Sequence, residues 1–163
     1  MRAELYEIIP CPMGRLATMP RPRGGDWLRG EIESFKISGV TDMISMLTPA
    51  EETELDLQSE QRYCEEFGLG FHRHPVADRG IPMQPAFGEF IDSLLPILRQ
   101  GGFLAIHCRA GIGRASVTAA ALLCGLGMRS SEAMDLISQA RGFEIPDTEV
   151  QRDFISNFDR QDR

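Results

Sequence analysis

The chain has 163 residues, enough for one domain of ordinary size that buries its own core without disulfide or metal staples. Acidic residues outnumber basic residues by 24 to 17, and the resulting formal net charge of −7 argues against broad binding to nucleic acid or to anionic membranes. We therefore expect a single domain over residues 1–163, on which any basic site is local.

The N-terminal and cysteine patterns favour a soluble, cytoplasmic protein. Residues 1–7 carry acids where a secretory signal would carry positive charge and then an apolar run. The longest mainly apolar stretch, residues 115–128, is interrupted by polar residues and is too short for a membrane span. The four cysteines are scattered without a Cys-x-x-Cys pair, which gives no pattern for zinc or for a disulfide scaffold: Cys11, Cys64, Cys108 and Cys124. We expect free thiols and neither a metal nor a cofactor.

The first half of the chain predicts strands separated by an acidic helical region. Residues 1–39 are expected to hold a strand and loops, with Trp27 as a packing anchor. The apolar run at 40–47 predicts a buried strand, and residues 68–75 a further one. Between them, residues 49–67 alternate acids with apolar residues in a helix-like rhythm.

The second half predicts one more strand among helices. Residues 83–100 have helical apolar spacing, 103–107 predict a buried strand, and 112–126 are apolar nearly all round, as is typical of a central helix. Two further helices are expected, over 132–141 with a cap at Ser130 or Ser131, and from a cap at Asp147 to about residue 158.

This alternation of strands and helices predicts an α/β fold. We expect a central, largely parallel sheet of four to five strands flanked by helices, with the core in residues 40–158.

A glycine-rich loop joins the strand at 103–107 directly to the central helix. It reads His107-Cys108-Arg109-Ala110-Gly111-Ile112-Gly113-Arg114. The backbone amides of residues 109–114 can surround phosphate oxygens, because glycine permits close approach and the helix N-terminus favours an anion. The loop lacks the Gly-Lys-Ser/Thr ending of a nucleotide-binding loop, so ATP is a poor match. The sequence therefore predicts a phosphate site of another kind.

Two side chains of this loop supply chemistry. Cys108 stands beside Arg114 and the helix N-terminus, surroundings that favour the thiolate, and a thiolate facing bound phosphate is a nucleophile. Arg114 can grip two phosphate oxygens and stabilise the charge of the transition state, which lysine cannot do with the same geometry. The pattern predicts a covalent phosphocysteine.

His-Cys-x-x-Gly-x-x-Arg resembles the signature loop of the cysteine-based protein tyrosine phosphatase superfamily, most closely its small dual-specificity-like members. Residues 74–82, His-Pro-Val-Ala-Asp-Arg-Gly-Ile-Pro, resemble the mobile general-acid loop of that family. The resemblance spans roughly residues 40–158. It implies that Asp78 protonates the leaving oxygen and later acts as a base, that His107 orients the cysteine, and that Gln151 helps to position water.

Ala115 departs from the family pattern. A Ser or Thr usually follows the loop arginine and helps the thiolate to leave in the second step. Ser116 offers a hydroxyl one residue later, but a rotation of about 100° per helical residue points it elsewhere. We therefore expect slow hydrolysis of the intermediate.

Three functions compete on these residues. The first is a phosphomonoester hydrolase acting on phosphotyrosine, and on phosphoserine or phosphothreonine, in a phosphorylated protein or peptide. The second is a phosphate-binding module with weak or no turnover, which Ala115 motivates. The third, a sulfurtransferase or thiol reductase, leaves Asp78 and Arg114 unexplained.

Two side-chain roles stay open at this stage, as does the oligomeric state. The Arg109 side chain either selects substrate or is solvated. Cys64 offers a protective disulfide with Cys108, as second cysteines do in some members of the superfamily.

Overall fold

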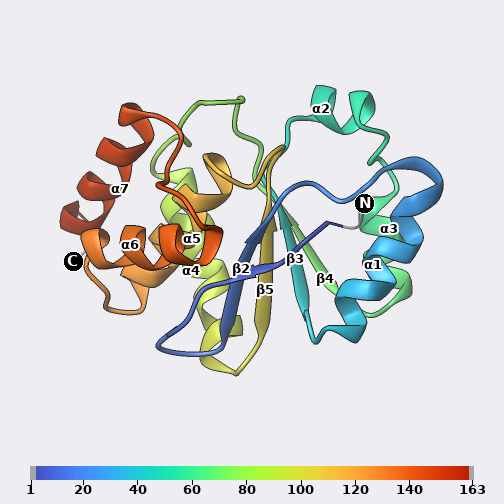
Figure 1. The fold of residues 1–163 in the computed structure, drawn as a ribbon, viewed down its shortest axis with the longest axis horizontal. Coiled ribbons are helices and arrows are strands. Elements are labelled where there is room, and N and C mark those ends of the chain that lie inside the picture. Colours follow the sequence, from blue (N-terminus) through green and yellow to red (C-terminus); the bar gives the residue numbers. More distant parts are fainter. Residues whose placement is uncertain (1–2, 162–163) are drawn as a thin grey trace.

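The computed structural model describes residues 3–161, with side chains up to residue 158, around a five-stranded sheet (Figure 1). The strands are β1 (Tyr6–Glu7), β2 (Arg15–Met19), β3 (Asp42–Ser45), β4 (Gly70–Arg73) and β5 (Phe103–His107). They lie in the order β1-β2-β5-β3-β4, and only the edge pair β1 and β2 is antiparallel. The predicted α/β fold with a largely parallel sheet is confirmed.

Helices cover both faces of this sheet and its carboxyl end (Figure 1). On one face lie α1 (Leu28–Ile37), which follows a short 3-10 helix at Gly25–Trp27, and α3 (Glu60–Glu66). On the other lie α4 (Ala86–Arg99), α5 (Arg114–Gly125), α6 (Ser130–Arg141) and α7 (Glu149–Gln161). The short helix α2 (Pro49–Glu54) follows β3 at the carboxyl end of the parallel strands. None of the helices within residues 3–161 is long and apolar enough to cross a membrane.

The sheet separates two apolar cores. The larger packs α4, α5, α6 and α7 against one face and includes Ile44, Ile106 and Leu122. The smaller packs α1 and α3 against the other face and includes Phe35 and Cys64. Since α5 is buried almost all round, it forms the centre of the larger core, as its sequence predicts.

The first 39 residues contribute more than the predicted strand and loops. Helix α1 buries Leu28, Ile32 and Phe35 on the sheet, so the core is not confined to residues 40–158. The sequence did not predict α1 because four charged residues and a glycine interrupt its apolar positions. Trp27 is not a packing anchor, since 62% of it is exposed.

Several predicted boundaries are also corrected. The acidic region at 49–67 is two helices, because Asp56 adopts a positive φ and the chain turns between α2 and α3. Helix α6 begins at Ser130, with Arg129 at its N-cap and no side-chain cap. The cap at the start of α7 is Thr148 and not Asp147. The Thr148 hydroxyl accepts a hydrogen bond from the Gln151 backbone amide at 3.1 Å.

Candidate active site

The predicted phosphate loop lies at the carboxyl end of the central strand, a usual place for ligand sites in parallel sheets. Strand β5 is buried along its whole length between β2 and β3, and the chain passes from His107 through the loop into α5 at Arg114. Gly111 has a φ of +76°, and a Cβ there would lie 2.5 Å from the Met19 carbonyl. The turn beside β2 therefore requires glycine, for both conformation and space.

Cys108 occupies the inner side of this loop. Its side chain is nearly inaccessible, at 3% exposure, and its Sγ accepts a hydrogen bond from the Gly111 amide at 3.3 Å. The amino end of α5 begins six residues later and adds its partial positive charge. Amide and helix end both favour negative charge on sulfur, which is the form that attacks phosphorus.

Arg114 is buried and donates hydrogen bonds to five acceptor atoms around the loop, one of which is the Met46 carbonyl, 3.5 Å from Nη1. Its Nη1 donates to Glu51 Oε1 at 2.7 Å and to the Val76 carbonyl at 2.8 Å. Its Nη2 donates to Glu51 Oε2 at 2.9 Å and to Asp78 Oδ1 at 3.1 Å. The bidentate contact with Glu51 therefore takes the end-on edge of the guanidinium.

The other edge of Arg114, formed by Nε and the second hydrogen of Nη2, binds Asp78 and not Glu51. Nε makes no hydrogen bond to a described residue, and the second Nη2 hydrogen points to Asp78, whose side chain is 59% exposed. A phosphate oxygen that replaces Asp78 would accept a hydrogen bond from Nη2–H of Arg114, and a second oxygen of the same phosphate would accept one from Nε–H. That arrangement is the bidentate grip that sequence reasoning assigned to Arg114.

Glu51 is the acid that sequence reasoning missed. Burial alone would raise the pKa of its carboxyl, but hydrogen bonds from Arg114 and from the Thr48 amide, with the charge of Arg114, lower it to about 2. Thr48 and Glu51 form a capping box at the start of α2, in which each side chain binds the backbone amide of the other. The Thr-x-x-Glu spacing was the available signal, since it predicts such a box.

The Arg109 side chain binds α2 and is not simply solvated. Its Nε contacts Glu51 Oε2 at 3.3 Å, and Nη2 binds Glu54. These bonds raise the pKa of the Arg109 guanidinium. The loop is thereby attached to α2 by two arginines, Arg109 and Arg114.

His107 is paired beneath the loop with a second missed acid, Glu60 of α3. His107 Nε2 lies 2.7 Å from Glu60 Oε2, and Nδ1 lies 3.3 Å from the Cys108 carbonyl, so both ring nitrogens face acceptors. Burial lowers the pKa of His107, but the charge and hydrogen bond of Glu60 outweigh it, and the net shift is upward. The ring thus links Glu60 to the Cys108 backbone, and no sequence signal marked Glu60 as the partner of His107.

Asp78 and Gln151 come together from distant segments. Gln151 Nε2 donates to the Gly80 carbonyl at 3.1 Å, and a Cβ on Gly113 would lie 2.9 Å from its amide. Arg79 Nη1 also binds Asp147 Oδ2 at 2.9 Å. The start of α7 therefore supports both the loop that carries Asp78 and the phosphate loop, which places Gln151 at the site.

The position after Arg114 offers no hydroxyl to the cysteine. Ala115 is fully buried, and Ser116 Oγ is buried without a hydrogen bond to any described residue. Cys64 does not reach Cys108, because it packs in the smaller core across the sheet, and both are free thiols. The protective disulfide is therefore absent.

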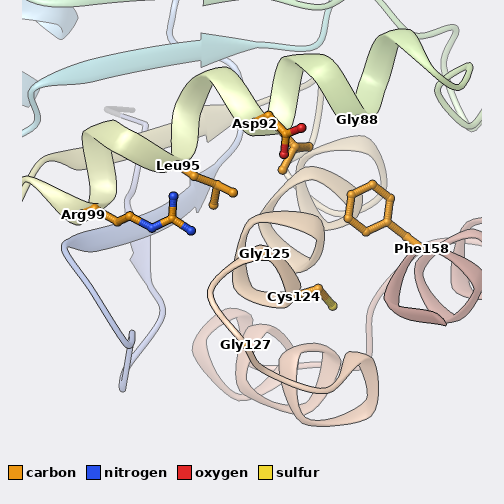
Figure 2. A pocket seen from close by; sticks show the side chains of 9 residues that line it. Gly88, Asp92, Leu95, Arg99, Cys124, Gly125, Gly127 and Phe158 are labelled. Atoms are coloured by element: carbon orange, nitrogen blue, oxygen red, sulfur yellow. The ribbon is translucent and has the colours of Figure 1, made fainter. Parts of the chain in front are cut away.

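A separate pocket of about 410 Å³ opens at the other end of α5 (Figure 2). Arg99, Asp92 and Leu95 of α4 line it together with Cys124 and Phe158. Helix α5 rises about 1.5 Å per residue, so this end lies roughly 16 Å from Arg114. The pocket contains none of the predicted site residues. Among residues 3–158 no three His, Cys, Asp or Glu side chains cluster in a way that could hold a metal ion.

Comparisons with known proteins agree with this geometry. Cyclin-dependent kinase inhibitor 3 of Rattus norvegicus is 26% identical over 133 residues, which are 80% of this chain and 63% of the relative. A probable protein tyrosine phosphatase type IVA of Dictyostelium discoideum is 28% identical over 129 residues, 78% of this chain and 72% of that protein. The solved structure of kinase associated phosphatase, with its catalytic cysteine replaced by serine, has a TM-score of 0.85, 21% identity, and coverage of 99% and 96% of the two chains.

The fold and the loop place the chain in the cysteine-based protein tyrosine phosphatase superfamily. Within it, the model of the cyclin-dependent kinase inhibitor 3 (CDKN3) family matches residues 25–135, and the chain belongs to that family. The chain covers 63% of the length of the rat relative, which is less than two thirds.

Replacing Glu51 by Gln should weaken phosphate binding. The charged partner that fixes Arg114 is lost, and hydrogen bonds to charged groups are worth about 1.5–3 kcal/mol, so affinity for inorganic phosphate should fall by roughly 10- to 100-fold. NMR titration with phosphate measures this. Glu54→Gln is the matched control, because that acid lies on the same helix and binds only Arg109. Equal affinities for the two variants would contradict the role of Glu51.

Replacing Glu60 by Gln should lower the pKa of His107, which NMR can follow because the chain has only three histidines. A raised pKa means that the pair stabilises the fold fully below about pH 6.5, and that this stability is lost as pH rises through the raised value. The melting temperature of the variant should therefore fall furthest below wild type near pH 6, for a loss of about 3–5 kcal/mol. Glu65→Gln, an exposed acid on α3, is the control; a pH-independent difference would refute the charged pair.

Proposed function

We propose that this chain hydrolyses phosphomonoesters through a phosphocysteine on Cys108. The observation that carries the proposal is the pairing of a buried thiol, bound by the Gly111 amide, with an arginine that Glu51 holds so that one edge faces the loop. The phosphatase superfamily to which the chain belongs supports the same chemistry.

In the first step, the Cys108 thiolate attacks phosphorus. The sulfur–phosphorus bond forms as the bond from phosphorus to the leaving oxygen breaks. Asp78, which takes up a proton from solvent once it has left Arg114, gives that proton to the leaving oxygen. Arg114 and the loop amides bind the remaining phosphate oxygens as charge develops on them. Arrival of phosphate displaces Asp78 from Arg114 and frees the carboxyl for this transfer.

In the second step, water attacks the phosphocysteine. Asp78, now ionised, takes a proton from the water, the sulfur–phosphorus bond breaks, and inorganic phosphate leaves. Gln151 lies beside Gly113 and holds the Asp78 loop through Gly80, so its part is to position that loop and the attacking water. Because Ala115 provides no hydroxyl, the Gly111 amide, the helix end and the positive charge of Arg114 have to stabilise the departing thiolate.

The substrate class that we propose is a phosphorylated protein or peptide, with phosphotyrosine and also phosphoserine or phosphothreonine as targets. The family of the chain supports this class. The name of its structural neighbour, kinase associated phosphatase, makes a phosphorylated kinase a sensible first substrate to test. We further propose a single catalytic domain that works in the cytoplasm without a metal ion or other cofactor.

A phosphate-binding module with little turnover is the second candidate. Ala115 favours it, because a slow second step would leave phosphate on the cysteine. Asp78 argues against it, since a binding module has no use for a proton donor within 3.1 Å of the arginine.

Hydrolysis of a small aryl phosphate tests the mechanism. Wild type should be active in the presence of a chelator, Cys108→Ser should be inactive, and Asp78→Asn should lose about 100-fold or more in kcat, because general acids typically contribute 10²–10⁴-fold. Reduced wild-type protein that binds phosphate without turnover would instead favour the binding module.

Ala115→Ser should raise steady-state turnover by about tenfold, since a hydroxyl that hydrogen-bonds to the leaving thiolate assists the second step. Stopped-flow measurement should show a burst of aryl alcohol in wild type that the variant reduces. Ser116→Ala is the control and should leave both rates unchanged, because Ser116 Oγ binds no described residue. A wild type without a burst and a variant without a gain would place the slow step elsewhere.

A further inference from the structure

Exposed apolar side chains gather beside the candidate site. Among residues 3–158, eight large apolar residues are exposed, and four of them come from two short segments, 81–83 and 143–150. Single exposed apolar residues are common, but a concentration of them marks an interaction surface. We call these four the apolar rim: Ile81, Met83, Phe143 and Val150.

Side-chain contacts join both segments to each other and to the phosphate loop. Gly80 and Gln151, the chain neighbours of Ile81 and Val150, are hydrogen-bonded at 3.1 Å. Arg141 joins the second segment to the loop, because its guanidinium lies 4.7 Å from the Phe143 ring and donates to the Ala110 carbonyl at 3.5 Å. Ile81 and Val150 therefore flank the contact between the Asp78 loop and α7, and Phe143 lies beside an arginine that binds the phosphate loop.

The site itself restricts what can cover the rim. Anything that binds there while the loop holds its phosphate must carry both a phosphomonoester and apolar groups. A nucleic acid would meet a protein of net charge −7 and would offer few apolar groups at its edge. A protein segment carries both features, because residues beside a phosphorylated side chain can be apolar.

We propose that the apolar rim binds apolar residues of a phosphorylated protein segment, within four positions of the residue that is dephosphorylated. Four extended residues span roughly 13 Å, which allows contact with the rim while the phosphate occupies the loop. This inference rests on the proposed function and narrows its substrate class from phosphorylated proteins or peptides in general to those with apolar residues beside the phosphorylated residue.

Two phosphopeptides of equal length and charge test the rim, one with Leu at the flanking positions and one with Ser. Wild type should prefer the Leu peptide by about tenfold in kcat/KM, as expected for burial of one or two apolar side chains. In the double variant Met83→Ser/Val150→Ser the preference should fall to about twofold or less. The preference is the ratio of kcat/KM for the two peptides measured with the same protein, so a change that slows the chemical step equally for both peptides does not alter it.

Ile37→Ser is the matched control. Ile37 is 80% exposed, as is Met83, but it ends α1 in the other helical layer. It should keep the full preference. Equal use of both peptides by wild type, or equal loss in the control, would overturn the proposal.

Two other occupants predict different results. If the rim joins two copies of this chain, sedimentation will show a dimer that the double variant dissociates, with the peptide preference intact. If it contacts a lipid surface, wild type will prefer vesicles that contain a phosphorylated inositol lipid over both peptides, and the double variant will lose that preference. Either result overturns the proposal.

An experiment can distinguish failure of the proposed hydrolase function from failure of the proposed peptide binding at the apolar rim. An inactive wild type with aryl phosphate would reject the hydrolase, whereas the binding of both peptides to Cys108→Ser, followed by fluorescence anisotropy, would still report a preference for apolar flanks. The double variant in that background should lose the same preference.

Discussion

The ion pair between Arg114 and Glu51 is the contact on which the site depends. A buried guanidinium is costly unless a carboxylate and further acceptors satisfy it, and Arg114 is 3% exposed. Glu51 is in place because Thr48 caps α2 directly after β3, while Arg114 begins α5 after β5. The pair thus joins the ends of two neighbouring strands and leaves one guanidinium edge for phosphate.

One acidic segment balances the charge of the whole loop. Residues 49–66, between β3 and β4, supply Glu51 for Arg114, Glu54 for Arg109 and Glu60 for His107. Each contact lies behind or beside the loop and none lies on the Arg114 edge that faces Asp78. An incoming phosphate therefore has to displace only Asp78, which is the more exposed of the two acids that bind Arg114. That displacement brings the acid to where a proton is needed.

The sequence predicts the phosphate loop but not the acidic residues that hold it in place. Cys108 and Arg114 could be predicted because their spacing and the flanking strand and helix are local features. Glu51 had a local signal in its capping box, which went unused. Glu60 had none, because its pairing with His107 spans 47 residues and arises only when α3 packs against the sheet. Helix α1 was missed for a related reason, since tertiary burial outweighs its weak apolar pattern.

The two chemical steps place different demands on the same loop. Attack on phosphorus needs a thiolate, which the Gly111 amide and the start of α5 favour in the free protein. Departure of that thiolate needs stabilisation as the sulfur–phosphorus bond breaks. The same two groups and the charge of Arg114 must provide it, because Ala115 has no hydroxyl and Ser116 Oγ makes no hydrogen bond to a described residue. His107 contacts the Cys108 carbonyl and holds the backbone rather than the sulfur. The environment of sulfur is thus complete for the first step and lacks one donor for the second.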